Sequence, residues 1–140
     1  MKAEPIVIER TLNAPLQKVW QALTEKEHMK WYCEPDDFKL EQGFRFMFYG
    51  NPKAKTWATS CQIVAFEPLR KLDITWNFDD YPGISLVSWE LWGEHGKTRL
   101  KLTHSGLENI PAEAKELNWE EFLSGWEHYV DTALTNYLNQ

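Results

Sequence analysis

Hydrophobic and polar positions alternate along several short segments in the first three quarters of the chain. The first segment is PIVIERTL at 5–12, where Ile6 and Ile8 share one face with Arg10. This period of two, with β-branched residues, predicts a strand. Arg10 is either a side chain that snorkels out at a sheet edge or a charged pocket residue.

Helical spacing replaces this alternation in the next segment. Pro15 suits a first helical turn, and apolar residues recur at helical intervals up to Thr24. Thr24 and Glu27 then form a T-x-x-E capping box, which predicts a second short helix ending near Trp31. Two short helices are therefore expected directly after the first strand.

A series of strands follows, separated by turn-forming residues. Short connections of this kind make neighbouring strands antiparallel, with one face of the sheet apolar. In the longest strand, alternation alone does not show which face points inward. The expected strands lie at 38–40, 44–49, 56–66, 71–76, 84–92 and 98–105.

The last part of the chain is helical in pattern. After Pro111, apolar residues keep a 3.6-residue rhythm to Leu138, and Asn118 with Glu121 forms a plausible N-terminal cap. The helix would contain about 20 residues and reach roughly 30 Å. We therefore predict one α+β domain over 1–140, with a curved antiparallel sheet of six to seven strands wrapped around this helix.

Composition narrows the classes of partner. The net charge is −6 and no Lys/Arg cluster is present, which argues against nucleic acid as a partner. The sequence has no basic amphipathic helix and no long apolar run, so membrane insertion is not expected. Two cysteines, Cys33 and Cys61, are too few for a disulfide framework. These features predict a cytoplasmic protein with reduced thiols.

The order of elements and several short motifs resemble the START/Bet v 1-like (SRPBCC) superfamily, whose members have a helix-grip fold. Within it the chain is similar to the branch named after the C-terminal domain of the activator of the heat-shock protein 90 ATPase. The motifs are APLQKVWQALTEKEHMKWY at 14–32, GFRF at 43–46, FEPLRKLDITW at 66–76, SLVSWEL at 85–91, GKTRLKLTHSGL at 96–107 and Gly125-Trp126.

This resemblance covers nearly the whole chain and implies the fold more specifically than the function. The superfamily includes lipid carriers, hormone receptors, cyclases and antibiotic-sequestering proteins. Two positions depart from the usual pattern: Gln42-Gly43 replaces a paired glycine, and a small residue of the fourth strand corresponds to Ser60 or Cys61. The resemblance does not extend to the activator's N-terminal domain, so it does not imply chaperone activation.

The chain is rich in aromatic residues, at 14%, including 8 Trp. Each ring is either part of a filled core or part of a cavity wall. A tightly filled core usually favours Leu, Ile and Val, so many indoles on one face favour leftover space for a small hydrophobic or aromatic ligand. The candidate ligand-binding residues are Trp31, Phe46, Phe48, Trp57, Trp76, Trp89, Leu102, His104, Trp119, Phe122, Trp126 and Tyr129.

Two of the polar candidates have alternative interpretations. His104 ends an apolar strand face, either as a hydrogen-bonded core or rim residue or as a pocket residue whose charge changes near neutral pH. Cys33 is either a small buried hydrophobe or a thiol at the pocket mouth. No cofactor, metal site or catalytic residue is assigned, because the sequence contains no G-x-S-x-G, phosphate loop or short His/Cys ligand spacing.

Three functions remain open at this point. The first is a carrier, sensor or sequestering protein for a small apolar ligand. The second is a cyclase-like enzyme in which His104, Tyr129 or an acid at the rim moves protons. The third is a protein that binds a chaperone or client through an exposed surface near Trp92. Edge strands would also allow a homodimer, which the sequence does not require.

Overall fold

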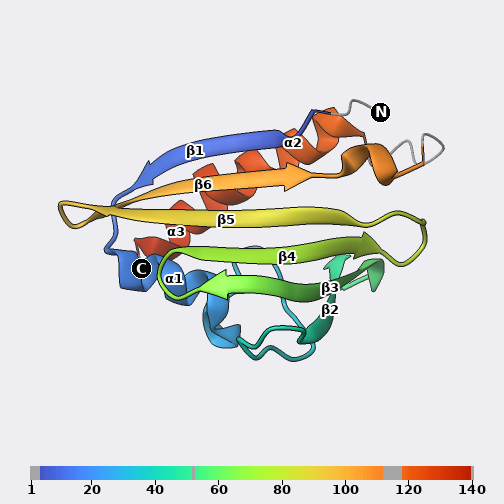
Figure 1. The fold of residues 1–140 in the computed structure, drawn as a ribbon, viewed down its shortest axis with the longest axis horizontal. Coiled ribbons are helices and arrows are strands. Elements are labelled where there is room, and N and C mark those ends of the chain that lie inside the picture. The colour runs from blue at the N-terminus through green and yellow to red at the C-terminus, as the bar shows by residue number, and fades with distance from the viewer. Residues whose placement is uncertain (1–3, 52, 112–117, 140) are drawn as a thin grey trace.

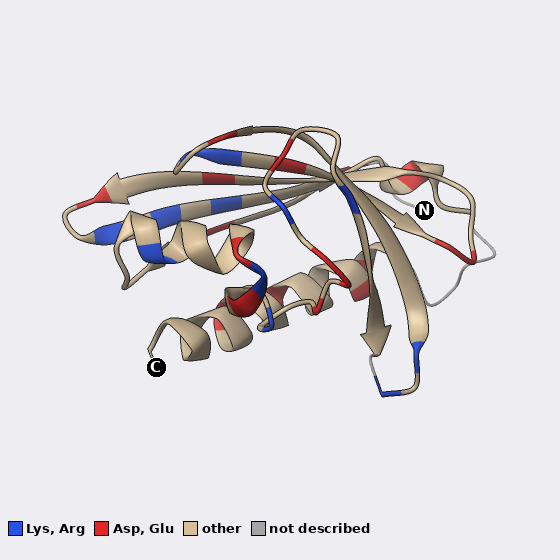
Figure 2. Ribbon diagram, turned by 90° about the horizontal axis from the view of Figure 1, so that it is seen from below, with Lys and Arg blue, Asp and Glu red and all other residues tan. Residues whose placement is uncertain are grey.

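Six antiparallel strands form one curved sheet, and a long C-terminal helix crosses its concave face (Figures 1 and 2). The computed structural model describes residues 4–51, 53–111 and 118–139. The predicted α+β helix-grip architecture is confirmed. The strands, in the spatial order β1-β6-β5-β4-β3-β2, are β1 (Ile6–Leu12), β6 (Lys97–Ser105), β5 (Ser85–Glu94), β4 (Lys71–Phe78), β3 (Thr56–Glu67) and β2 (Arg45–Asn51).

The concave face carries the apolar half of each alternating strand. Trp89 of β5 lies opposite Leu102 of β6, and neither side chain is exposed. In β3, where the sequence left the sidedness open, Cys61 and Ile63 point inward, and the register shifts just after Ile63. That irregularity interrupts the alternation, so the successive residues Val64 and Ala65 are both exposed.

The first predicted helix is present, but the second is reduced to a single turn. Helix α1 (Leu16–Thr24) is followed by the 3-10 turn η1 (Lys26–His28). The predicted capping box is wrong, because the Thr24 hydroxyl donates to the Trp20 carbonyl at 2.8 Å within α1. With its hydroxyl directed back into α1, Thr24 provides no side-chain cap for the next turn.

The predicted strand at 38–40 is also wrong. The chain pairs with the sheet just before this segment, at Asp36. The Asp36 N–H donates to the Met47 carbonyl, and the Asp36 carboxylate accepts the Met47 N–H. The Phe38 N–H donates instead to the side chain of Asp37. Local side-chain bonds thus replace a strand ladder, and this segment lies against the outer edge of β2.

The long helix has three parts: α2 (Trp119–His128), a π-helical turn η4 (Tyr129–Leu134) and α3 (Thr135–Leu138). The predicted cap is confirmed, because Asn118 Oδ1 accepts the Glu121 N–H at 2.9 Å. The part of the predicted element at 112–117 lies outside the described residues. A further 3-10 turn, η2 (Leu107–Asn109), follows β6.

The π turn keeps the buried side chains of this helix on one face. They recur at every fourth position: Trp126, Val130, Leu134 and Leu138. An α-helix turns about 100° per residue, so a spacing of four drifts by about 40° at each step. The wider π turn reduces that drift and lets all four residues face the sheet.

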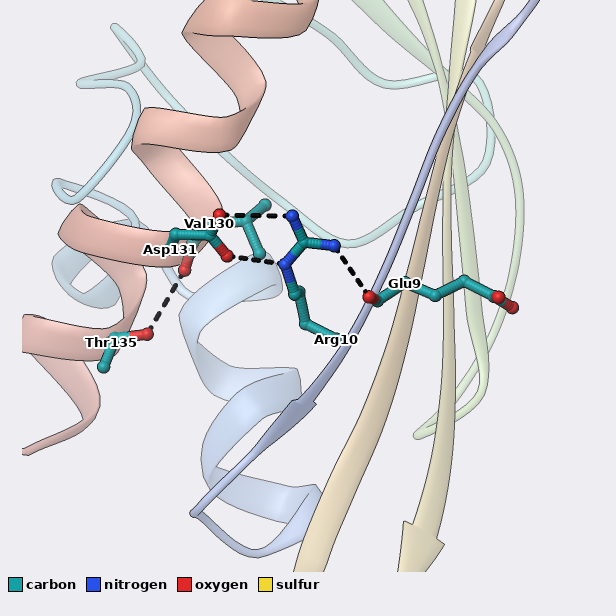
Figure 3. A network of polar contacts seen from close by, with 5 residues as sticks. All are labelled: Glu9, Arg10, Val130, Asp131 and Thr135. Atoms are coloured by element: carbon teal, nitrogen blue, oxygen red, sulfur yellow. Dashed lines mark hydrogen bonds and ion pairs between the residues drawn. The ribbon is translucent and has the colours of Figure 1, made fainter.

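A polar network joins the π turn to the edge strand β1 (Figure 3). The Arg10 guanidinium donates to both carboxylate oxygens of Asp131, at 2.7 and 3.2 Å, and to the Glu9 carbonyl at 2.9 Å. Thr135 donates its hydroxyl to the Val130 carbonyl within the helix. Arg10 therefore emerges at a sheet edge, which agrees with the first of its two predicted roles.

No helix among the described residues is both long enough and apolar enough to cross a membrane.

The Arg10–Asp131 pair should contribute little to stability, because the two side chains are 38% and 44% exposed. In a double-mutant cycle with Arg10→Met and Asp131→Asn, we expect a coupling free energy of about 1 kcal/mol or less. Urea unfolding with and without about 1 M NaCl measures it, and salt should reduce it. A coupling above about 2 kcal/mol that does not respond to salt would contradict this account.

Candidate ligand-binding site

A cavity of about 440 Å³ lies between the β2, β3 and β4 strands and helix α2. This volume is within the range of small-molecule sites, about 300–1,000 Å³. Eight of its twelve lining residues are aromatic. The lining residues are Tyr32, Phe48, Gly50, Trp57, Thr59, Trp76, Phe78, Glu121, Phe122, Gly125, Trp126 and Tyr129.

The aromatic walls are built from ring pairs that hold one another in place. Trp76 of β4 contacts Phe48 of β2 at 5.2 Å and Trp126 of α2 at 5.4 Å between ring centroids. Phe78 links the strand and helix sides by packing on Phe122 at 5.8 Å. Edge and tilted contacts of this kind favour defined ring orientations, so the walls are preorganised before any ligand arrives.

Trp57 is held at the wall in an unusual backbone conformation. Its φ is +61°, a left-handed value that strains a bulky residue. It lies opposite Gly50, between the pairs Tyr49–Ala58 and Asn51–Thr56. A Cβ atom on Gly50 would stand 2.8 Å from the Trp57 Cβ, so only glycine leaves room for the indole in this position.

Gly125 occupies the middle of the lining stripe of α2, one turn from Glu121, Phe122 and Tyr129. A Cβ atom built there would meet no heavy atom within 4 Å. Glycine inside a helix is about 0.8–1.0 kcal/mol less favourable than alanine. The glycine is therefore not required by close packing, and its effect is to leave the cavity wider.

Behind the cavity wall, His104 is fully buried and belongs to a chain of hydrogen bonds. The Trp126 indole N–H donates to His104 Nδ1 at 3.0 Å, and His104 Nε2 lies 2.8 Å from the Ser85 hydroxyl. Ser85 in turn donates to the Trp76 carbonyl at 2.8 Å. Because an indole only donates, Nδ1 must accept, and the proton is assigned to Nε2.

The same surroundings keep His104 uncharged. Burial lowers the pKa of His104 to about 3, and both ring nitrogens already have partners. Of its two predicted roles, the structure supports the hydrogen-bonded core residue. A change of charge near neutral pH, the alternative, does not fit this environment.

The two thiols also lie inside the protein. Burial raises the pKa of Cys33 to about 12 and that of Cys61 well above its usual range, so both remain protonated at neutral pH. Burial likewise raises the pKa of Tyr32, whose hydroxyl has no nitrogen or oxygen partner and lies near these thiols. Cys33 is a buried residue, one of its two predicted roles, and neither thiol is a poised nucleophile.

The cavity brings together six of the twelve predicted site residues. The described residues that line it from this set are Phe48, Trp57, Trp76, Phe122, Trp126 and Tyr129. Their role in binding remains a prediction. The six others, Trp31, Phe46, Trp89, Leu102, His104 and Trp119, do not line it.

These six have structural positions elsewhere. Trp31 donates its indole N–H to the Ala22 carbonyl at 2.8 Å, and Trp119 donates to the Glu4 carbonyl at 2.9 Å. Phe46 packs against Phe38, with ring centroids 5.1 Å apart. Trp89 and Leu102 are completely buried, and the Trp89 ring packs against Trp31, Tyr32 and Trp126.

Sequence reasoning missed the other half of the lining: Tyr32, Gly50, Thr59, Phe78, Glu121 and Gly125. Phe78 and Glu121 carried a usable signal, because Phe78 follows Trp76 at the strand period and Glu121 precedes Gly125 by one helical turn. Gly50 carried none, and Gly125 appeared only as part of a family motif, since the space left by a missing side chain is visible only in three dimensions. Among the described residues, no three His, Cys, Asp or Glu side chains gather as they would around a metal ion.

Comparison with known proteins gives the same fold. The model of one protein family, described as activator of Hsp90 ATPase homolog 1-like protein, matches residues 13–139. The chain belongs to this family. The family match begins just after β1 and continues through the long helix. No curated protein sequence matches significantly.

Several solved structures share the architecture. Protein MLL2253 from Mesorhizobium loti is 25% identical with a TM-score of 0.81, and the match covers 97% of each chain. CalU16 from Micromonospora echinospora is 30% identical, with a TM-score of 0.73 over 96% of this chain and 75% of that one. BH1534 from Bacillus halodurans is 26% identical, with a TM-score of 0.74 over 96% of both.

Buried neutral His104 should make this family member sensitive to acid. Its folded pKa, about 3, lies below the unfolded value, about 6.5. The unfolded state therefore takes up the proton first, and stability should fall as the pH drops below 6.5 towards 3. The loss from this residue can reach about 1.4 kcal/mol per pH unit.

His104→Gln tests this, because the glutamine amide can accept from Trp126 and donate to Ser85. We expect urea unfolding to show a loss of about 1–3 kcal/mol at pH 7.5, and a gap from the unsubstituted protein that narrows towards pH 5. Exposed His128→Gln is the control and should keep the original pH dependence. An unchanged pH slope in His104→Gln would refute the assignment.

Proposed function

We propose that the protein binds a small, largely apolar and aromatic molecule in the cavity between β2, β3, β4 and α2. The supporting observation is that several residues around this cavity have backbone conformations or residue types that local structure does not favour. Gly125 lies inside helix α2, Trp57 has a left-handed backbone, and the π turn begins at the lining residue Tyr129. Such departures from local preference concentrate at functional sites, where the space they create is used.

The chemistry of the lining supports binding through burial of apolar surface. Removing apolar area from water contributes roughly 25 cal/mol per Å². Ring edges and faces on opposite walls, such as Trp76 and Phe122, would contact a flat ligand from two sides. The preformed wall contacts reduce the ordering that binding requires, which favours affinity.

The positions of the titratable groups favour binding over catalysis. The cyclase-like alternative needs a group free to move protons inside the cavity. Of the groups that this alternative named, His104 is neutral and uses both ring nitrogens. Burial raises the pKa of Tyr129, and Glu121, the acid at the rim, is exposed to solvent. Burial also keeps the thiols of Cys33 and Cys61 protonated. We therefore propose a carrier, sensor or sequestering role.

Filling the cavity from Gly125 tests the proposal. Gly125→Ala should stabilise the fold by up to about 1 kcal/mol, because it removes the helix penalty without a clash. Gly125→Leu should fill the space and abolish binding. The probe is the neutral dye N-phenyl-1-naphthylamine, whose binding is followed by fluorescence titration, with thermal unfolding measured in parallel.

Ser124→Ala is the matched control, because Ser124 is an exposed neighbour in the same helical turn. It should change stability slightly and leave the dye affinity unchanged. A folded Gly125→Leu protein that binds the dye as well as the original would place binding elsewhere. If the unsubstituted protein binds neither this dye nor any compound from a library of neutral aromatic molecules, the proposal fails.

A further inference from the structure

The charge around the cavity is one-sided. Of the twelve lining residues, Glu121 is the only Asp or Glu, and none is Lys, Arg or His. Glu121 is exposed, which places its carboxylate at the solvent side of the lining. Two imidazoles contact lining residues from outside the cavity. That of His104 lies behind Trp76 and Trp126 and is neutral. That of exposed His128 packs on Tyr129, with ring centroids 5.8 Å apart.

An anionic ligand is poorly matched to this lining. A carboxylate moved from water into an aromatic cavity needs a cation or several hydrogen-bond donors as compensation. Two of the lining's donors are already used, since the Trp126 N–H is bonded to His104 and the Thr59 hydroxyl donates to the Trp57 carbonyl. The donors that remain, such as the Tyr32 hydroxyl, are neutral groups, and no lining residue is a cation. The Glu121 carboxylate would repel the anion as well.

A cation is matched by the same features. The faces of Trp, Tyr and Phe rings carry negative electrostatic potential and attract ammonium groups within about 6 Å. Trp57, Phe78 and Phe122 form a connected set of rings, with centroid distances of 6.4 Å and 5.8 Å. Glu121 directly precedes Phe122 on α2 and would complement the charge at the rim.

We infer that the cavity selects an apolar organic cation, an amine or ammonium carried on a ring-containing body, with Glu121 as the residue that determines this preference. The inference rests on the proposed function, because it concerns the same cavity. The apolar body would lie among Phe48, Trp76 and Trp126, and the cationic group would lie towards Glu121.

Two lysines provide a competing source of charge. Lys53 and Lys55 are exposed on the hairpin between β2 and β3, near Gly50 and Trp57, but do not line the cavity. Their charges are open to solvent and screened by salt. They would favour an anion only if they folded over the mouth, and a variant can test this directly.

Three probes that share one ring system separate charge from shape. They are 9-anthracenemethanol, which is neutral, 9-(methylaminomethyl)anthracene, which is cationic at pH 7, and 9-anthracenecarboxylate. Fluorescence anisotropy gives the Kd of each. We expect the amine to bind at least about fivefold more tightly than the alcohol, and the carboxylate at least about tenfold more weakly.

Substitutions test whether Glu121 causes the preference for the amine. Glu121→Gln should reduce the advantage of the amine to below about twofold and change the Kd of the alcohol by no more than about twofold. Glu120→Gln makes the same change in net charge one residue away, outside the lining, and should keep the advantage. The Lys53→Gln/Lys55→Gln double variant should leave the order of the three probes unchanged.

The outcomes distinguish this inference from the proposed function. Binding of the alcohol and the amine with equal affinity, or strongest binding of the carboxylate, would overturn the charge preference while the cavity remains a binding site. A preference for the amine that survives Glu121→Gln would overturn the role of Glu121. Failure of all three probes to bind would count against the proposed function, and the inference would fall with it.

Discussion

The long C-terminal helix is too narrow to cover the concave face of a six-stranded sheet alone, and helix α1 covers only one end of it (Figure 1). Strands lie about 4.8 Å apart, so six of them span about 24 Å, whereas a helix with its side chains is about 10–12 Å wide. The helix runs under β1, β6 and β5 (Figure 1), where Trp89 and Leu102 are completely buried. The apolar face of β4, β3 and β2 must be covered by other means.

Large rings cover part of that remaining face and leave the cavity beside them. Phe48, Trp76 and Phe78 extend from the strands towards Phe122 and Trp126 of the helix. Rings reach further than aliphatic side chains but fill irregular space less completely. The aromatic content of the chain is therefore a consequence of the same geometric mismatch that leaves room for a ligand.

The buried polar groups hold the cavity walls in position, and the structure gives them no catalytic role. The chain from Trp126 through His104 and Ser85 to the Trp76 carbonyl joins the helix to β6, β5 and β4. A buried network with every member satisfied fixes orientation, because any other arrangement leaves a donor unpaired. It holds Trp76 and Trp126, two cavity walls, at one relative position.

Local pattern determined the elements of this protein, and tertiary structure decided its site. The strands from 44 onwards, the first helix, the Asn118 cap and the helix-grip architecture follow from periodicity and motif order, because burial on one face imposes a period on the sequence. Thr24 and the 38–40 segment were predicted wrongly, since local side-chain bonds competed with the expected cap and strand.

The lining of the cavity could not be predicted in detail from the sequence, because Gly50 and Gly125 contribute to it by having no side chain. Some rings line the cavity and others fill the core, and the difference depends on where the C-terminal helix stops covering the sheet. Only the folded chain sets that position.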